Sequence, residues 1–263
     1  MQTARTEAAD FARAVAWERR AHAQISPRVE PLRYGFACVD ARLPLVYFAN
    51  LLWVTAGAGA VGAGEIMADA DRVLADFEHR WVVVDQEPLW RALSEPFTVA
   101  GWGVQTHLFM THRRPPDRMP PLDAVREVTH EDLRAAEMRY MVSQLWCTSL
   151  EPARQVIEHH RRVGGALDER CFAIRHGDEV IAHAKLRHRD AIAQVEDVVV
   201  QEEHRGAGLG RLVTTAALAA GLALEPELMF IVAADDDWPK ELYARLGFQP
   251  AGRTRMFHRL PAP

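Results

Sequence analysis

Residues 195–212 place an apolar strand pattern, a glycine-rich turn and the start of a helix in direct succession. The turn carries glycines at alternate positions, Gly206, Gly208 and Gly210. Glycine adopts backbone conformations that other residues avoid, and without a Cβ it lets a ligand approach the main chain closely. The first amides of the following helix have no intrahelical partner and lie at the positive end of its dipole. We therefore expect an anion site here, with a pyrophosphate as the anion.

Two common phosphate-binding patterns do not fit this turn. A dinucleotide-binding Gly-x-Gly-x-x-Gly needs glycine where Arg211 or Val213 stands, and a P-loop needs Lys-Ser/Thr directly after Gly210. The pattern Arg/Gln-x-x-Gly-x-Gly/Ala does fit, with Arg205, Gly208 and Gly210 in its defining places. In this the chain resembles the GNAT superfamily of acyl-coenzyme-A-dependent N-acyltransferases. For the short pattern alone, an ordinary strand-to-helix turn is the alternative.

A second motif downstream supports the resemblance. Residues 228–233 have the pattern of a buried strand, and residues 235–239 that of a loop and helix start. The next segment, with Tyr243 four residues before Gly247-Phe248, resembles the helix end that closes GNAT domains. With both motifs present in the expected order, the chain is identified as a member of this superfamily.

The composition is that of a globular protein. Hydrophobic residues make up 49% and charged residues 25% of the 263 residues, enough for one large domain or two small ones. The net charge of −5 argues against a nucleic-acid partner. There is no apolar run long enough to span a membrane and no signal-peptide core. Cys38, Cys147 and Cys171 are widely spaced and predict reduced packing residues, so we expect a cytoplasmic protein, as a monomer or homodimer.

A proline-rich segment divides the chain near its middle. Residues 115–121 contain four prolines, which are excluded from helix interiors and central strands. We therefore predict an N-terminal domain over 1–114, a linker over 115–121 and a C-terminal domain over 122–263.

The two predicted domains share a sequence pattern. Gly101–Arg113 resembles Gly247–Arg259 at an offset of 146 residues, and Gly62-Ala63-Gly64 matches Gly206-Ala207-Gly208 at an offset of 144. A nearly constant offset suggests an internal duplication, with chance similarity of short apolar strands as the alternative.

The first copy lacks the features that the chemistry needs. The replacements are Val61 in place of Arg205, Ile66 in place of Gly210 and Phe97 in place of Tyr243. A branched side chain at position 66 should block the close approach of a pyrophosphate, and Phe97 has no hydroxyl. Proteins with a degenerate N-terminal half and an active C-terminal half occur in the GNAT superfamily, and this chain resembles that type.

The C-terminal half follows the element order that the resemblance implies. A strand over 124–128 precedes a helix start with Thr129 as the cap and Asp132 three residues later. The further expected elements are helices near 131–147 and 151–163, strands over 170–174, 180–186 and 192–200, and a hairpin turn at 176–178. We predict an α/β fold (an α+β mixed sheet): two GNAT-like domains, each a mostly antiparallel mixed sheet flanked by helices.

The resemblance also implies where acetyl-CoA binds. In GNAT enzymes the strand that corresponds to residues 195–200 separates from its neighbour, and its backbone holds the pantetheine arm and thioester. A backbone N–H near Val198 would donate to the thioester oxygen as this becomes negative. The residues implied in binding acetyl-CoA are Val198, Val199, Val200, Arg205, Gly206, Ala207, Gly208, Leu209, Gly210 and Arg211.

Two side chains are candidates for proton transfer. The phenol of Tyr243 has an ordinary pKa of about 10, near the value of about 8.5 for a thiol, so it can share a proton with the leaving thiolate. Glu196 is the candidate base, alone or through a water, because a charge in this otherwise apolar strand is costly unless it has a purpose. Strand alternation places Asp197 on the opposite face. A packing tyrosine and a structural carboxylate are the alternatives.

Other polar clusters predict no metal site. The run 159–162, which includes two adjacent histidines, is typical of a solvated helix face, and neighbouring helical residues do not converge on one metal. His183 and His188 have no ligand partners at a suitable spacing. The three aspartates of 235–237 suit a helix N-terminus.

The predicted function is transfer of an acetyl group from acetyl-CoA to a primary amine by direct attack on the thioester. The acceptor is a small molecule or a peptide, and the acidic balance favours a cationic one. The alternative is a non-catalytic acyl-CoA sensor or partner-recruiting module.

Overall fold

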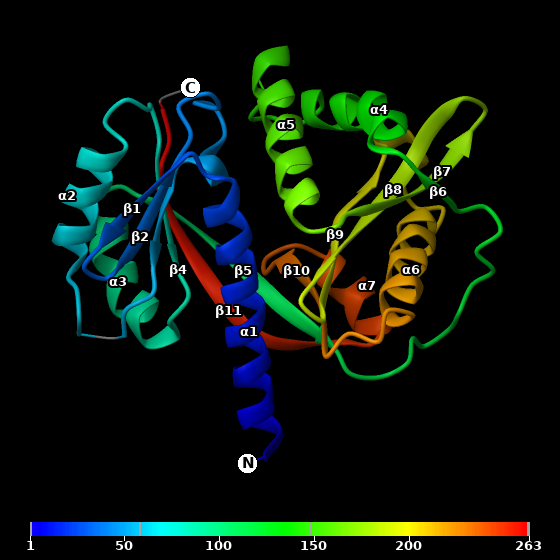
Figure 1. The fold of residues 1–263 in the computed structure, drawn as a ribbon, viewed down its shortest axis with the longest axis horizontal. Helices are drawn as coiled ribbons and strands as arrows, with labels where there is room; N and C mark the ends of the chain where they lie inside the picture. Colours follow the sequence, from blue (N-terminus) through cyan, green and yellow to red (C-terminus); the bar gives the residue numbers. More distant parts are fainter. Residues whose placement is uncertain (1, 58, 148, 262–263) are drawn as a thin grey trace.

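One eleven-stranded sheet runs through the whole protein (Figure 1). The structure is a computed structural model that describes residues 2–57, 59–147 and 149–261. The sheet order is β1-β2-β3-β4-β11-β5-β10-β9-β8-β7-β6. The strands are β1 Arg28–Leu32, β2 Gly35–Val39, β3 Leu51–Val54, β4 Arg80–Val84, β5 Gly103–His112, β6 Arg126–Val128, β7 Arg170–His176, β8 Glu179–Arg189, β9 Ile192–Val200, β10 Leu228–Ala234 and β11 Phe248–Arg259. The α-helices are α1 Gln2–Ile25, α2 Ala63–Val73, α3 Glu87–Val99, α4 His130–Val142, α5 Leu150–Ala166, α6 Leu209–Leu222 and α7 Pro239–Arg245, with 3₁₀ turns η1 Tyr47–Ala49 and η2 Glu202–His204.

The predicted fold class is confirmed. Only β3·β4 and β9·β10 pair in parallel among the described strands, and the other neighbours are antiparallel. The capping box at the start of α4 forms as expected, because the Thr129 hydroxyl and the Asp132 carboxylate each accept a backbone N–H of the other residue. In the described part of the chain, no helix has both the length and the apolar character needed to cross a bilayer.

The two halves of the chain exchange their last strands. β5, from the N-terminal half, pairs with β10 and β11, and β11 pairs with β4 and β5. Each of these strands therefore pairs only with strands of the other half. Two separate sheets were expected, but the long antiparallel β5·β11 ladder joins them into one.

The same order of elements occurs in both halves, in line with the sequence repeat. β3-α2-β4-α3-β5 in the first half corresponds to β9-α6-β10-α7-β11 in the second. The parallel pair differs, however. β3 stays paired with β4 up to its last residue, Val54, whereas β9 extends five residues beyond its last pair with β10.

Helix α1 lies across the junction of the two halves, where Figure 1 shows it in front of β5 and β11. Its Trp17 packs edge-on against Phe230 of β10, with ring centroids 5.6 Å apart. The same apolar cluster includes Trp81 of β4 and Phe109 of β5. The N-terminal helix therefore reaches the sheet of the C-terminal half, including the strand beside the predicted site.

Candidate active site

Strands β9 and β10 separate at the predicted thioester site. Their parallel pairing runs from Ile192–Leu228 to Val195–Ile231 and then stops, although β9 continues to Val200. The end of β10 pairs with β5 on its other side. The backbone of β9 beyond Val195 is therefore not hydrogen-bonded to β10, which is the arrangement expected for a strand that presents its amides to a ligand.

A bulge in β9 changes which side chains face each side. The β8·β9 register shifts so that Asp197 and Val198 together lie opposite a single residue of β8, and Asp197 has a left-handed backbone with φ of 52°. The expectation that Asp197 faces away from Glu196 is therefore wrong, because the extra residue breaks the strand alternation. Asp197 instead lies 2.7 Å from the Nζ atom of Lys185, which also pairs with Glu137 on the face that α4 covers.

The glycine-rich turn between β9 and α6 is open. Gly206 and Gly208 have φ of 81° and 78°, and a Cβ built on either would meet no atom within 4 Å. Gly208 is the N-cap residue of α6, whose N-terminus has no side-chain cap among the described residues. The turn therefore offers uncapped helix amides beside exposed, left-handed glycines, which fits a pyrophosphate.

The other predicted binding residues line this turn to different degrees. Val198 and Val200 are half-buried against the core under α6, whereas Val199 is fully buried. Arg205 and Ala207 are exposed, and Leu209 and Gly210 are half-buried at the start of α6. Arg211 is turned toward the linker, where its guanidinium pairs with Asp117 at 2.6 Å. Its side chain therefore has a carboxylate partner already.

Tyr243 lies in α7 within the core of the C-terminal half and is only 7% exposed. Burial raises the pKa of its phenol, and the charges of Glu196 and Asp237 add to this effect. The phenol therefore stays protonated at neutral pH. It is suited to sharing a proton with a thiolate through a hydrogen bond more than to giving it up completely.

Glu196 is joined to a second carboxylate that the sequence did not reveal. The Nε2 atom of Gln194 donates to Glu196 at 2.7 Å and to Glu18 of α1 at 2.9 Å. Burial raises the pKa of Glu18 to about 8, with a further contribution from Glu196 that Arg187 opposes. Burial also raises the pKa of Glu196, against the charge of Arg187. Glu18 is far from Glu196 in sequence, so no spacing could have predicted this pair.

A buried ion-pair network continues from Asp197 along β8. The Lys185 Nζ atom lies 2.5 Å from Glu137 of α4 and 2.7 Å from Asp197. Burial disfavours the charge on Lys185, but Asp197, Glu169 and Glu137 outweigh it and raise the pKa of this lysine. The same ammonium holds the pKa of Asp197 well below its usual range, despite the burial of this carboxyl. The network fixes the bulge against α4.

The histidines of α5 are not on a solvated face, and that interpretation is wrong. His159 is 4% exposed, and its ring lies 5.5 Å from that of His22 in α1. Burial lowers the pKa of His22 and of His160 to about 4, so these rings are neutral at physiological pH. The sequence misled because α1, which belongs to the other half, covers this face of α5.

A separate hollow of about 440 Å³ lies between α3 and β11. It is lined by Glu87, Trp90, Arg91, Ser94, Asp235, Arg253 and Arg255. None of the predicted binding or catalytic residues is among them, so the hollow is not part of the site at β9.

Comparisons with known proteins bear on the family and the fold. Residues 128–248 match the family model described as the acetyltransferase (GNAT) family. No match is found among the curated proteins. Among solved structures, a GCN5-related N-acetyltransferase from Kribbella flavida has a TM-score of 0.61 at 16% identity, covering 95% of this chain and 96% of its own. A functionally unknown conserved protein from Staphylococcus epidermidis has a TM-score of 0.69 at 12% identity, covering 90% and 95%.

A third structure bears on the two-part architecture. It is a tandem GNAT protein from the clavulanic acid biosynthesis pathway, with a TM-score of 0.51 at 19% identity, covering 76% of this chain and 70% of its own. At these identities the structures show the likeness of the fold alone. Residues 128–248, which match the family model, therefore form a GNAT acetyltransferase domain in the C-terminal half of the chain.

Proposed function

We propose that the protein transfers an acetyl group from acetyl-CoA to a primary amine of a small molecule or peptide. The observation that carries this proposal is the end of β9, which leaves β10 after Val195 and leads directly into the open turn at Gly206 and Gly208. A thioester arm along the free edge of β9 and a pyrophosphate at the start of α6 would lie on one continuous stretch of backbone. The Val198 N–H is the proposed donor to the thioester oxygen.

Tyr243 is the proposed acid. When the amine attacks the carbonyl carbon, the C–S bond breaks and the sulfur becomes a thiolate. The Tyr243 hydroxyl would stabilise that charge by a shared proton, since burial keeps the phenol protonated. Its negative neighbour Glu196 would disfavour ionisation of the phenol, so the proton would be shared with the thiolate through a hydrogen bond and not transferred completely.

Glu196 is the proposed base for the amine proton, directly or through a water, and Glu18 is its partner. At pH 7 a Glu18 with a pKa of about 8 is protonated, so the pair carries at most one negative charge, on Glu196. That charge would attract a cationic amine, and Glu196 could accept the proton that the amine must lose.

The proposed division of labour follows the two halves. Residues 122–263 would form the catalytic domain, residues 1–114 a degenerate GNAT-like domain, and residues 115–121 the linker between them. Ile66, in place of the third turn glycine, is fully buried in the core of the first half. Phe97, in place of Tyr243, stacks on Phe257 with ring centroids 4.3 Å apart. Both positions therefore serve packing.

The test is release of free coenzyme A from acetyl-CoA, measured with a thiol reagent across a panel of primary amines. This proposal requires amine-dependent release above the rate of hydrolysis, and acetylated amine in the products. Saturable binding of acetyl-CoA without release for any amine class would support the alternative, an acyl-CoA sensor or partner-recruiting module. We place the protein in the cytoplasm, where acetyl-CoA is available as the substrate.

The carboxylate pair predicts a specific pH dependence of stability. In the unfolded chain Glu18 has a pKa near 4.3, and in the folded protein a value of about 8. Between pH 5 and pH 8 the folded state therefore holds a proton that the unfolded state has lost, so stability should fall as pH rises. Glu18→Gln should flatten this slope, whereas Glu7→Gln, at the other glutamate of α1, should not. Unfolding by urea at several pH values measures the free energy of unfolding as a function of pH. Equal pH slopes of this free energy for wild type and Glu18→Gln would contradict the buried pair.

A further inference from the structure

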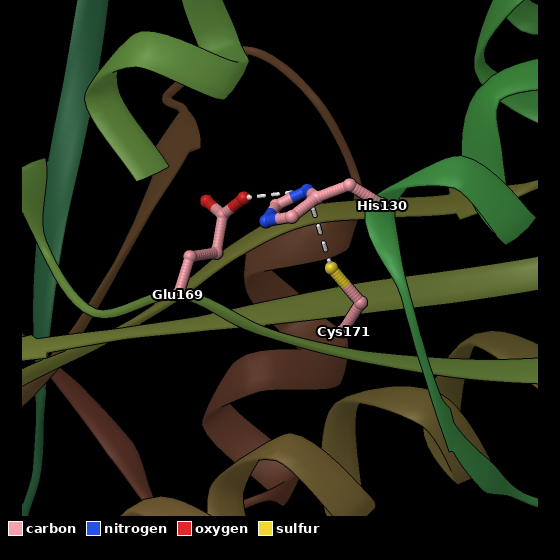
Figure 2. A group of neighbouring side chains, drawn as sticks. All are labelled: His130, Glu169 and Cys171. Atoms are coloured by element: carbon pink, nitrogen blue, oxygen red, sulfur yellow. Dashed lines mark hydrogen bonds and ion pairs between the residues drawn. The ribbon is translucent and has the colours of Figure 1, made fainter. Parts of the chain in front are cut away.

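Three potential metal ligands meet at the start of α4 and β7. They are His130, the first residue of α4, Cys171 in β7, and Glu169, which directly precedes β7 (Figure 2). The His130 Nδ1 atom lies 3.5 Å from Glu169 Oε1 and 3.6 Å from Cys171 Sγ. The three ligand atoms all lie within 4.8 Å of one another.

These separations match the edges of a zinc tetrahedron. With Zn–N of about 2.0–2.1 Å, Zn–O of about 2.0–2.2 Å and Zn–S of about 2.3 Å, neighbouring ligand atoms lie about 3.3–3.6 Å apart. The 3.5 Å separation of His130 Nδ1 and Glu169 Oε1 is long for a direct hydrogen bond between nitrogen and oxygen, whereas the 3.6 Å between Cys171 Sγ and His130 Nδ1 also fits a hydrogen bond to sulfur. Glu169 and Cys171 also approach the same imidazole nitrogen, Nδ1. A Cys-His-Glu proton relay needs the two partners on different nitrogens, so the arrangement points to one shared centre.

Glu169 supplies independent evidence for a missing partner. Its side chain is 0% exposed, and its Oε1 atom has no hydrogen-bond partner among the described residues. The other oxygen, Oε2, accepts from Arg187 Nε at 2.5 Å. An unpaired buried carboxylate oxygen is costly, so its orientation toward His130 calls for a cation.

The local backbone is arranged to admit this carboxylate. A Cβ on Gly164 of α5 would lie 2.5 Å from Glu169 Oε1, so a larger residue would displace the carboxylate. Asp168 has a left-handed backbone with φ of 49°, which turns the chain just before Glu169. Strain of this kind is common where side chains are held for a function.

We propose that His130 Nδ1, Glu169 Oε1 and Cys171 Sγ bind one Zn²⁺ ion. The fourth position would be taken by water, since the His130 side chain is 32% exposed and gives the site an opening to solvent. A thiolate and a carboxylate together neutralise the two positive charges. Arg187 would remain on the second oxygen of Glu169 and orient this ligand, as outer-shell donors do. The ion would fasten the start of α4 to β7 at the edge of the buried network.

A second group of similar composition does not qualify. Glu137, His183 and Asp197 also lie close enough together to hold an ion. The ammonium of Lys185 already lies 2.5 Å from Glu137 and 2.7 Å from Asp197. The Lys185 ammonium is therefore the cation of this second group, whereas the His130 site has no such cation among the described residues.

The experiment is a cobalt titration of the full-length protein after treatment with a chelator. Co²⁺ reports a thiolate ligand by a near-ultraviolet charge-transfer absorption, and Zn²⁺ should displace the Co²⁺. We expect one equivalent of Co²⁺ with this absorption. Cys171→Ser should abolish the absorption, and Cys38→Ser, at another buried cysteine, should retain it. His130→Ala should weaken binding by at least about 10–100-fold, the loss caused by removing even an outer-shell partner.

Three results would overturn the proposal: absence of stoichiometric binding, binding without thiolate absorption, or wild-type affinity in His130→Ala. The last would mean adventitious binding elsewhere. If Cys171→Ser does not fold, His130→Ala decides, because its side chain is partly exposed and its loss leaves the core intact. None of these readouts depends on acetyl transfer, so failure of the metal site and failure of the proposed activity are distinguishable.

Discussion

Tyr243→Phe should lower kcat by about 10²–10⁴-fold while leaving the affinity for acetyl-CoA nearly unchanged, because it removes only the shared proton at the leaving thiolate. The ring would still fill its place in the core of the C-terminal half. The effect should shrink with an acyl donor whose thiol is more acidic, since a better leaving group needs the proton less. Steady-state kinetics with two acyl donors measures both effects.

Tyr34→Phe is the matched control for this substitution. The Tyr34 hydroxyl bonds to Asp69 at 3.0 Å in the N-terminal half, away from β9. Tyr34→Phe should change the stability of the protein slightly and leave kcat unchanged. A Tyr243→Phe enzyme with wild-type kcat, under conditions where chemistry limits the rate, would remove Tyr243 from the mechanism.

Lys185→Met should destabilise the protein by about 3–5 kcal/mol, because it leaves the carboxylates of Glu137 and Asp197 buried without their cation. Denaturant unfolding measures the loss. Adding Glu137→Gln and Asp197→Asn to the Lys185→Met chain should recover much of it, since no buried charge then remains unpaired.

The destabilisation caused by Lys185→Met should be smaller at acid pH. In the wild type the pKa of Asp197 is lower in the folded protein than in the unfolded chain, where it is near 3.9. The ionised carboxylate therefore stabilises the folded protein above the unfolded-state pKa, and this stabilisation is lost as pH falls through the folded-state pKa. Without Lys185 the Asp197 carboxyl would be neutral more readily in the folded state, so acid would favour folding. Lys240→Met, at the other lysine of the chain, removes a partly exposed pair with Asp235 and should cost less than about 1 kcal/mol. Equal effects of the two substitutions would contradict the buried network.

Local pattern was enough to predict the elements of the C-terminal half. The Thr129–Asp132 capping box, the open glycines and the order of the strands depend on residues close in sequence, where backbone preferences decide the structure. The bulge at Asp197 could not be predicted in this way, since one extra residue in β9 depends on its register with β8.

The other features that the sequence did not predict depend on contacts between segments that are distant in the chain. Glu18, Glu137 and Asp117 pair with site residues of the C-terminal half only because α1, α4 and the linker fold onto it. The exchange of β5 and β11 is equally invisible in the sequence, because both strands have the same apolar pattern and either partner would satisfy it. Burial of His159 under α1 follows from the same long-range packing.

We expect one acetyl-CoA site per chain, at the turn between β9 and α6. Isothermal titration of acetyl-CoA tests it, with Gly208→Asp as the disruptive variant and Gly101→Asp as its control. Both glycines have a left-handed backbone with open space around the Cβ position, but only Gly208 is the N-cap residue of α6. We expect one equivalent for wild type, Gly101→Asp and Ile66→Ala, and no binding for Gly208→Asp, whose carboxylate would repel the phosphates. Two equivalents for the wild type, or wild-type affinity in Gly208→Asp, would contradict it.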